Sequence, residues 1–193
     1  METTAVGFRV KSGWATAVLL GGPMEAPKVI DRRVVQLSDP AIPASCQPYH
    51  AALDLPAGDG VKAVARLVKI VERFGSRAVA ELLTQYHDAG YRVLGIGLVV
   101  GSQVDPATIH NEHIRAHAEE GRLFRVVIEN AGRNAGLATT VTVERQLLTR
   151  ASQNLRTPEL KLKKDVTALG SPLGGRWRAE EKAAALAAWM VLA

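Results

Sequence analysis

The chain has very little cysteine, no internal repeat and no long hydrophobic run. Cys46 is the only cysteine, so a disulfide framework within the chain is excluded. No apolar stretch approaches the roughly 18–20 residues that a membrane span needs. The first residues, METTAV, lack the basic segment and apolar stretch of a signal peptide. These absences predict a cytoplasmic protein with no membrane partner.

The bulk composition is that of a globular protein with an excess of positive charge. Hydrophobic residues make up 47% of the 193 residues and charged residues 22%, which is enough apolar material for a sizeable core. We expect one domain over 1–193, with a helical, basic C-terminal portion from about 144 to 193. The formal charge of +5 is compatible with nucleic acid, phosphate or an acidic partner, and equally with a basic protein that binds none of them.

The first part of the chain has the pattern of antiparallel strands. Two apolar, β-branched segments flank Lys11-Ser12-Gly13, where the glycine favours a tight turn. A third segment alternates apolar and polar residues, as expected of a sheet edge that faces water. The predicted strands are 4–10, 14–20 and 28–37.

Helical periodicity begins at Gly60, and from there helices and strands alternate. We expect a helix with a break near Gly75, and a second helix opened by Asp105-Pro106. The continuous apolar run at 91–101 predicts a buried parallel strand between them. A further strand and three helices follow, at 138–143, 144–155, 158–169 and 178–192. This order predicts an α/β fold, a mixed five-stranded sheet of three antiparallel strands and then parallel strands, flanked by helices.

Two stretches and the order of elements resemble the Holliday-junction resolvase-like branch of ribonuclease H-like domains. VGFRVKSGWATAVL is similar to the opening strand, glycine-bearing turn and second strand of that branch. LKLKKDVTALG and RAEEKAAALAAW, within 160–189, resemble its valine-lysine helix, T-x-x-G turn and final lysine-bearing helix. The resemblance implies a ribonuclease H-like fold. It also implies an activity that depends on two divalent cations held by carboxylates, which activate water for phosphodiester cleavage.

The chain departs from the resemblance at the carboxylates themselves. The resemblance implies an aspartate on the first strand, but that position falls at Phe8 or Arg9. It also implies an acid at the end of the fourth strand. The segment 91–101 contains none, and the nearest acid is Asp105. The sequence therefore predicts that a two-metal nuclease centre is missing.

Three acidic residues remain near the positions where the other metal ligands are implied. Glu180 and Glu181 lie in the first turn of the last helix, where they also complement the helix dipole. Glu144 ends the fifth strand and has no evident partner in the sequence.

Histidines form the densest chemical cluster of the sequence. His110, His113 and His117 are spaced to share one helical face, and an i, i+4 pair can grip one metal ion. Together with Glu144 they are the candidate metal ligands. The alternative is a polar helix shoulder without a metal. Cys46 is either an inert thiol or a nucleophile, and His50 is then the only base nearby.

Basic residues gather at the first turn and in the last third of the chain. Lys11 and Ser12 could hold a phosphate with the free backbone N–H groups of their turn, or form an ordinary solvated hairpin. Trp177 could stack on a base or pack as a lid on the last helix. The candidate phosphate-binding or nucleic-acid-binding residues are Lys11, Ser12, Lys161, Lys164, Arg176, Trp177, Arg178 and Lys182.

Three functions remain open from the sequence. The first is a non-catalytic ribonuclease H-like module that needs no cofactor and binds nucleic acid through its basic surface. The second is a hydrolase or nuclease whose site has moved to the histidines and Glu144, with a divalent metal as cofactor. The third is a structural or interaction protein whose histidine helix forms a homodimer face.

Overall fold

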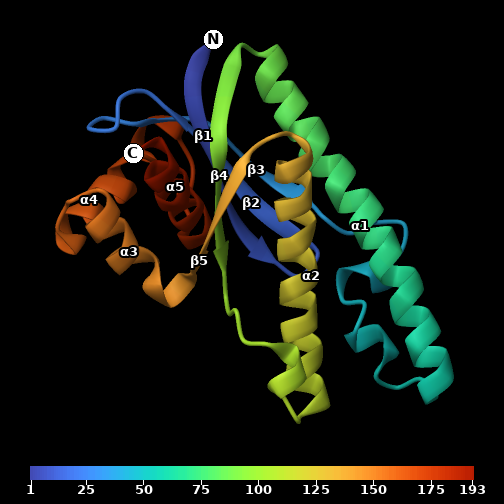
Figure 1. Cartoon of the computed structure of the whole chain (residues 1–193). Coiled ribbons are helices and arrows are strands. Elements are labelled where there is room, and N and C mark those ends of the chain that lie inside the picture. The colour runs from blue at the N-terminus through green and yellow to red at the C-terminus, as the bar shows by residue number, and fades with distance from the viewer.

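The computed structural model describes residues 1–193, apart from the side chain at position 57. Its centre is a five-stranded sheet in the order β3-β2-β1-β4-β5 (Figure 1). β1, β2 and β3 pair antiparallel, whereas β4 lies parallel to both β1 and β5. The α/β class and the mixed sheet expected from the sequence are confirmed. The strands are β1 (Glu2–Lys11), β2 (Trp14–Gly21), β3 (Lys28–Gln36), β4 (Tyr91–Val100) and β5 (Ala138–Val143).

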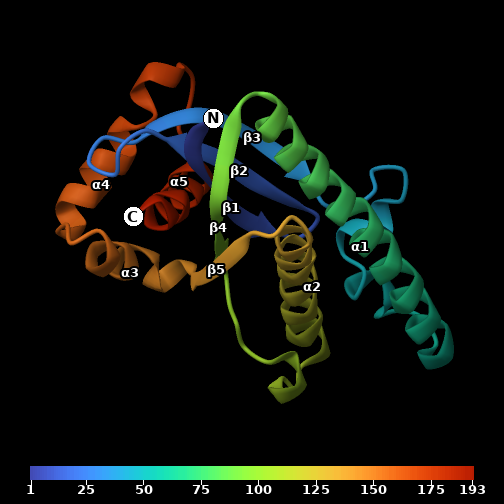
Figure 2. The same ribbon diagram turned by 45° about the horizontal axis from the view of Figure 1, so that its top comes forward.

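Helices cover both faces of the sheet (Figure 2). One face carries α1 (Ala57–Asp88) and α2 (Glu112–Asn134), and the other carries α3 (Leu147–Asn154), α4 (Glu159–Ala168) and α5 (Ala179–Leu192). Because neighbouring residues of a strand point to opposite faces, β1 supplies both cores. Phe8 is buried beneath α1 and α2, and Ala5 beneath α5. Within the described residues, no helix has both the length and the apolar character needed to cross a membrane.

The last helix approaches the sheet so closely that two strand positions have no room for a side chain. A Cβ atom on Gly7 of β1 would lie 1.8 Å from the carbonyl oxygen of Ala184. One on Gly97 of β4 would lie 2.3 Å from that of Ala187. The many alanines of α5 make this approach possible, because their short side chains leave the helix surface nearly flat against the strands.

The expected helix break near Gly75 is wrong. α1 is a single helix of 32 residues, about 48 Å long. Gly75 lies in its middle, where a Cβ atom would be 2.7 Å from Val127 Cγ1 and 3.0 Å from the carbonyl oxygen of Leu37. The glycine allows α2 and the end of the third strand to pack against α1, and this tertiary packing outweighs its weak helix propensity.

The start of the next helix also differs from expectation. Asp105 caps only a short 3-10 turn, Pro106–Thr108, by accepting a hydrogen bond from the backbone N–H of Ala107. α2 begins later, where the side chain of Asn111 accepts from the N–H of Ile114. His110 therefore lies before the helix, and the prediction that it shares a helical face with the later histidines is wrong.

Candidate functional sites

A buried arginine lies where the resemblance implies a metal-binding aspartate. Arg9 is on β1 and points to the face covered by α5, since it alternates with the oppositely directed Phe8. Its side chain is only 5% exposed. Its Nε atom donates to Glu144 Oε1 over 3.0 Å, and Nη2 donates to Glu144 Oε2 over 2.5 Å. Glu144, which follows β5 directly, thus has a partner that the sequence did not reveal.

This two-point ion pair fixes the ionisation of the carboxylate. The hydrogen bonds from Arg9 lower the pKa of Glu144 below its usual range, and the charges of Arg9 and Lys11 act in the same direction. Partial burial opposes them but does not prevail. Glu144 is therefore a permanent anion at neutral pH, and both of its oxygens are engaged by the guanidinium.

The acids at the start of α5 are likewise paired with cations. Lys11 Nζ lies 3.9 Å from Glu180 Oε1, and Arg32 Nη1 lies 3.3 Å from Glu181 Oε1. A pair of divalent cations needs several carboxylate oxygens that converge without a competing positive charge. The guanidinium of Arg9 occupies the centre of this region instead. The residues present do not fit a two-metal centre.

A groove borders this region on the side of the sheet edge. α5 packs on β1, β2 and β4, which leaves the outer part of β2 and β3 uncovered. The groove has a volume of about 690 Å³. Its floor is formed by strand residues and its wall by the residues that lead into α5. The lining residues are Trp14, Thr16, Arg32, Arg33, Val34, Arg176, Arg178, Glu180 and Glu181.

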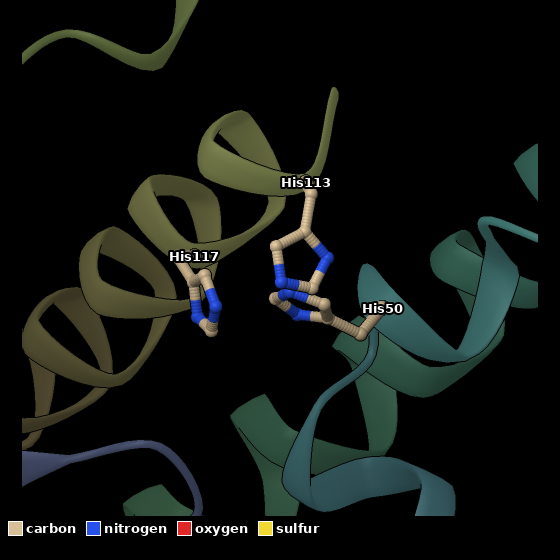
Figure 3. A group of neighbouring side chains, drawn as sticks. All are labelled: His50, His113 and His117. Atoms are coloured by element: carbon tan, nitrogen blue, oxygen red, sulfur yellow. The ribbon is translucent and has the colours of Figure 1, made fainter. Parts of the chain in front are cut away.

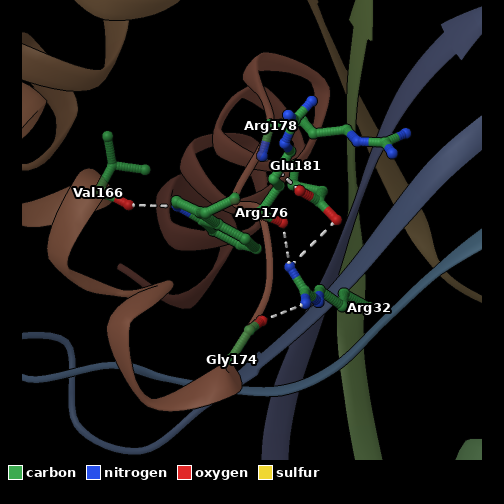
Figure 4. Close-up of polar contacts among 7 residues, drawn as sticks. Arg32, Val166, Gly174, Arg176, Arg178 and Glu181 are labelled. Atoms are coloured by element: carbon green, nitrogen blue, oxygen red, sulfur yellow. Dashed lines mark hydrogen bonds and ion pairs between the residues drawn. The ribbon is translucent and has the colours of Figure 1, made fainter.

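Arg32 of β3 holds the wall of this groove in place (Figure 4). Its Nη1 atom donates to the carbonyl oxygen of Arg176 over 2.7 Å, and its Nη2 atom to that of Gly174 over 2.8 Å. Together with the ion pair to Glu181, these contacts fasten the segment before α5 to the sheet. Arg32 is therefore a structural residue, although the groove is strongly basic around it.

Trp177 does not line the groove, but another tryptophan does. The indole N–H of Trp177 donates to the carbonyl oxygen of Val166 on α4 over 2.7 Å (Figure 4). Its ring packs so tightly over Gly170 that a Cβ there would lie 2.2 Å from Trp177 Cγ. Trp14, at the start of β2, lies in the groove lining. The only signal for it in the sequence is its place directly after the first turn.

The other basic candidates are spread over the α5 side of the molecule. Arg176 and Arg178 are exposed in the groove, and the described residues provide no polar partner for their side chains. Lys182 is half-buried on α5, and Lys164 is exposed on α4. Lys161 is 2.6 Å from Asp165 on the same helix, and the two line a different hollow. The carbonyl oxygen of Ser12 lies 3.6 Å from Cys46 Sγ.

The structure brings together two of the predicted histidines with one that was not among the metal candidates. His113 and His117, on the first turns of α2, face His50 (Figure 3). The centre of the His50 ring is 4.6 Å from that of His113 and 4.1 Å from that of His117. His110 is outside this cluster, and Glu144 is bound to Arg9. Sequence spacing could not reveal His50, because it comes from the proline-rich segment before α1.

Comparison with known proteins defines the class of fold. No protein-family model and no curated protein sequence matches the chain. Two solved structures match nearly its whole length, so the fold is of the ribonuclease H-like class. One is the structure of Thermus thermophilus RuvC, with a TM-score of 0.55 and 12% identity, covering 97% of this chain and 92% of the other. The other is T. thermophilus RuvC in complex with a Holliday junction substrate, with a TM-score of 0.56, 12% identity, and coverage of 97% and 91%.

Proposed function

We propose that this chain is a ribonuclease H-like module that binds nucleic acid without cutting it by two-metal chemistry. The observation that carries the proposal is the buried ion pair of Arg9 and Glu144 beside a basic groove. The fold is shared with a resolvase whose structure includes a Holliday junction. The guanidinium takes the place of a metal-binding carboxylate, so the region offers positive charge to phosphate rather than oxygen ligands to a metal.

The groove provides both kinds of contact that a flexible nucleic-acid strand needs. Arg176 and Arg178 lack competing partners among the described residues and are available to phosphate oxygens. Trp14 offers an aromatic face for stacking, a contact that tolerates any base. Glu180 and Glu181 restrict the basic surface to one side of the groove, because their charges would repel a backbone placed over α5.

Salt-dependent binding to single-stranded, duplex and branched DNA or RNA tests this function. At low salt we expect measurable binding, with an affinity that falls steeply as salt is added because counterions are released. Replacing Arg176 and Arg178 together by Ala should weaken binding and reduce the slope of log K against log salt by about 1 for each phosphate that is no longer neutralised. Absence of binding at low salt would overturn the proposal.

Two further variants separate the groove from general basicity. Trp14→Ala should weaken binding to single strands by about 1–3 kcal/mol for a stacked base. Arg77→Ala removes the same charge as a groove arginine, but from the exposed surface of α1, where Arg77 pairs only with Glu81. This control should leave affinity nearly unchanged. Equal losses for Arg77→Ala and the groove variants would show that binding does not use the groove.

A further inference from the structure

The histidine cluster contains a buried ring nitrogen without a partner. The side chain of His50 is 14% exposed, and its Nε2 atom is buried and makes no hydrogen bond within the described part of the chain. His113 and His117 lie beside it on α2 (Figure 3). A buried imidazole nitrogen that meets two further imidazoles and no donor or acceptor is a costly arrangement unless something else completes it.

A fully buried glutamate fixes the orientation of His50. Glu120 has no exposed surface, and its Oε1 atom is 2.9 Å from His50 Nδ1. The same oxygen accepts from the backbone N–H of His50 over 3.2 Å. A proton on Nδ1, donated to the carboxylate, leaves the Nε2 lone pair free and directed away from Glu120. A carboxylate that orients a histidine in this way is the usual outer partner of a metal-binding imidazole.

We propose that His50, His113 and His117 bind one Zn²⁺ ion, with Glu120 as a positioning residue. Candidate ligand atoms of the three histidines all lie within 4.8 Å of one another. Three nitrogens that each bind one zinc ion at about 2.0 Å lie about 3.3 Å apart, so modest side-chain rotations complete the site. His113 and His117 are exposed and free to make them.

The chemistry of the ligands selects the metal. Three neutral imidazoles with no carboxylate among them suit zinc and other late first-row ions, whereas Mg²⁺ and Ca²⁺ require oxygen ligands. Because two of the histidines are exposed, the fourth tetrahedral position faces solvent and is open to water. Zinc sites with three histidines and one open position are of the catalytic rather than the closed structural type.

The site joins segments that are far apart in the sequence. His50 belongs to the 3-10 turn His50–Ala52, which packs against α1 and α2. An ion held between this turn and α2 would cross-link the connection between β3 and α1 to the second helix. The cluster lies on the α1–α2 side of the sheet, and the basic groove lies on the α5 side. The zinc site therefore does not depend on the proposed nucleic-acid function.

The first experiment titrates the full chain, without a polyhistidine tag, with Zn²⁺ in competition with a coloured chelator. We expect one ion per chain, a tetrahedral visible absorption band when Co²⁺ replaces zinc, and a rise in Tm of about 5–10 °C at a hundredfold excess of metal over Kd. His113→Gln and His117→Gln change exposed side chains, so these variants should fold, and each should weaken zinc binding by about 100-fold or more.

His110→Gln is the matched control, because it removes an exposed histidine three residues before His113 and outside the cluster. It should bind zinc like the unaltered chain. Glu120→Gln should keep the 1:1 stoichiometry and the cobalt band but weaken affinity by about 10–100-fold. The proposal is overturned if the chain binds no zinc, or if His110→Gln lowers affinity as much as His113→Gln. An unchanged zinc affinity in Glu120→Gln would remove the positioning role of Glu120.

Discussion

Two carboxylate pairs join distant parts of the chain, and they differ in what they leave unused. In the Arg9–Glu144 pair the cation is buried, the carboxylate is half exposed, and both carboxylate oxygens are bonded. In the His50–Glu120 pair the carboxylate is fully buried, and both Glu120 Oε2 and His50 Nε2 lack partners. The first pair is complete in itself. The second has capacity left for another group, so the two places favour different ligands.

The largest effect should come from disturbing the packing that supports the first pair. Gly7→Ala places a methyl group against the backbone of α5, where neither the strand nor the helix can yield. We expect a loss of about 4 kcal/mol or more in the free energy of unfolding, together with loosening of the residues that line the groove. Urea denaturation followed by circular dichroism measures it. A loss below about 1 kcal/mol would contradict the close packing of α5 on β1.

The next effect should be an asymmetry between the two partners of the ion pair. Glu144→Gln leaves the buried guanidinium of Arg9 without its counter-charge and should cost about 2–3 kcal/mol, a value reduced because Glu144 is half exposed. Arg9→Met fills the same space with apolar atoms and leaves Glu144 free to turn to water, so it should cost less. Denaturant unfolding of both variants at neutral pH tests the order. The reverse order would show that Arg9 is well solvated.

A smaller effect should appear on acidification. The folded-state pKa of Glu144 is depressed, so its contribution to stability is present above the unfolded value of about 4.3 and disappears as pH falls through the lower folded value. The difference in unfolding free energy between the unaltered chain and Glu144→Gln should therefore shrink between neutral pH and about pH 3. A difference that stays constant over this range would indicate that the charge of Glu144 contributes nothing.

The smallest effect is a stabilisation beside the second pair. Gly121 follows Glu120 on α2, is exposed, and has open space where a Cβ would lie. Gly121→Ala should raise the free energy of unfolding by about 0.5–1 kcal/mol through helix propensity alone. It should leave zinc affinity unchanged, so it also controls for nonspecific effects near the histidines. Calorimetry checks the gain, and a destabilised Gly121→Ala variant would contradict the open environment of that position.

The fold was more accessible from the sequence than the sites were. Apolar alternation and the run at 91–101 predict the strands, because strand period and burial are local properties. The helix break near Gly75 was wrongly predicted because the glycine serves a contact with Val127 and Leu37, which are distant in the sequence. Local pattern shows that a residue is unusual, but not whether the reason is a break or a close contact.

The sites depend on pairs of residues that no local pattern connects. Arg9 and Glu144 are 135 positions apart, and His50 and Glu120 are 70 apart. The sequence correctly showed that the first strand carries a cation in place of an acid. It could not show which carboxylate would meet that cation, nor that a histidine from the proline-rich segment would join the pair on α2. Those partners are set by the tertiary fold alone.

The outer strand β3 has one more consequence, for how the molecule behaves at high concentration. Its charged side chains grip helical segments on both faces of the sheet: Asp31 accepts from Tyr86, Arg33 donates to Gln85, and Arg32 holds the segment at 174–176. Unpaired strand edges invite strands from other molecules, and charge at the edge discourages them. β3 is thus clasped on both sides, and strand-by-strand aggregation through this edge is disfavoured by the same arginine that shapes the groove.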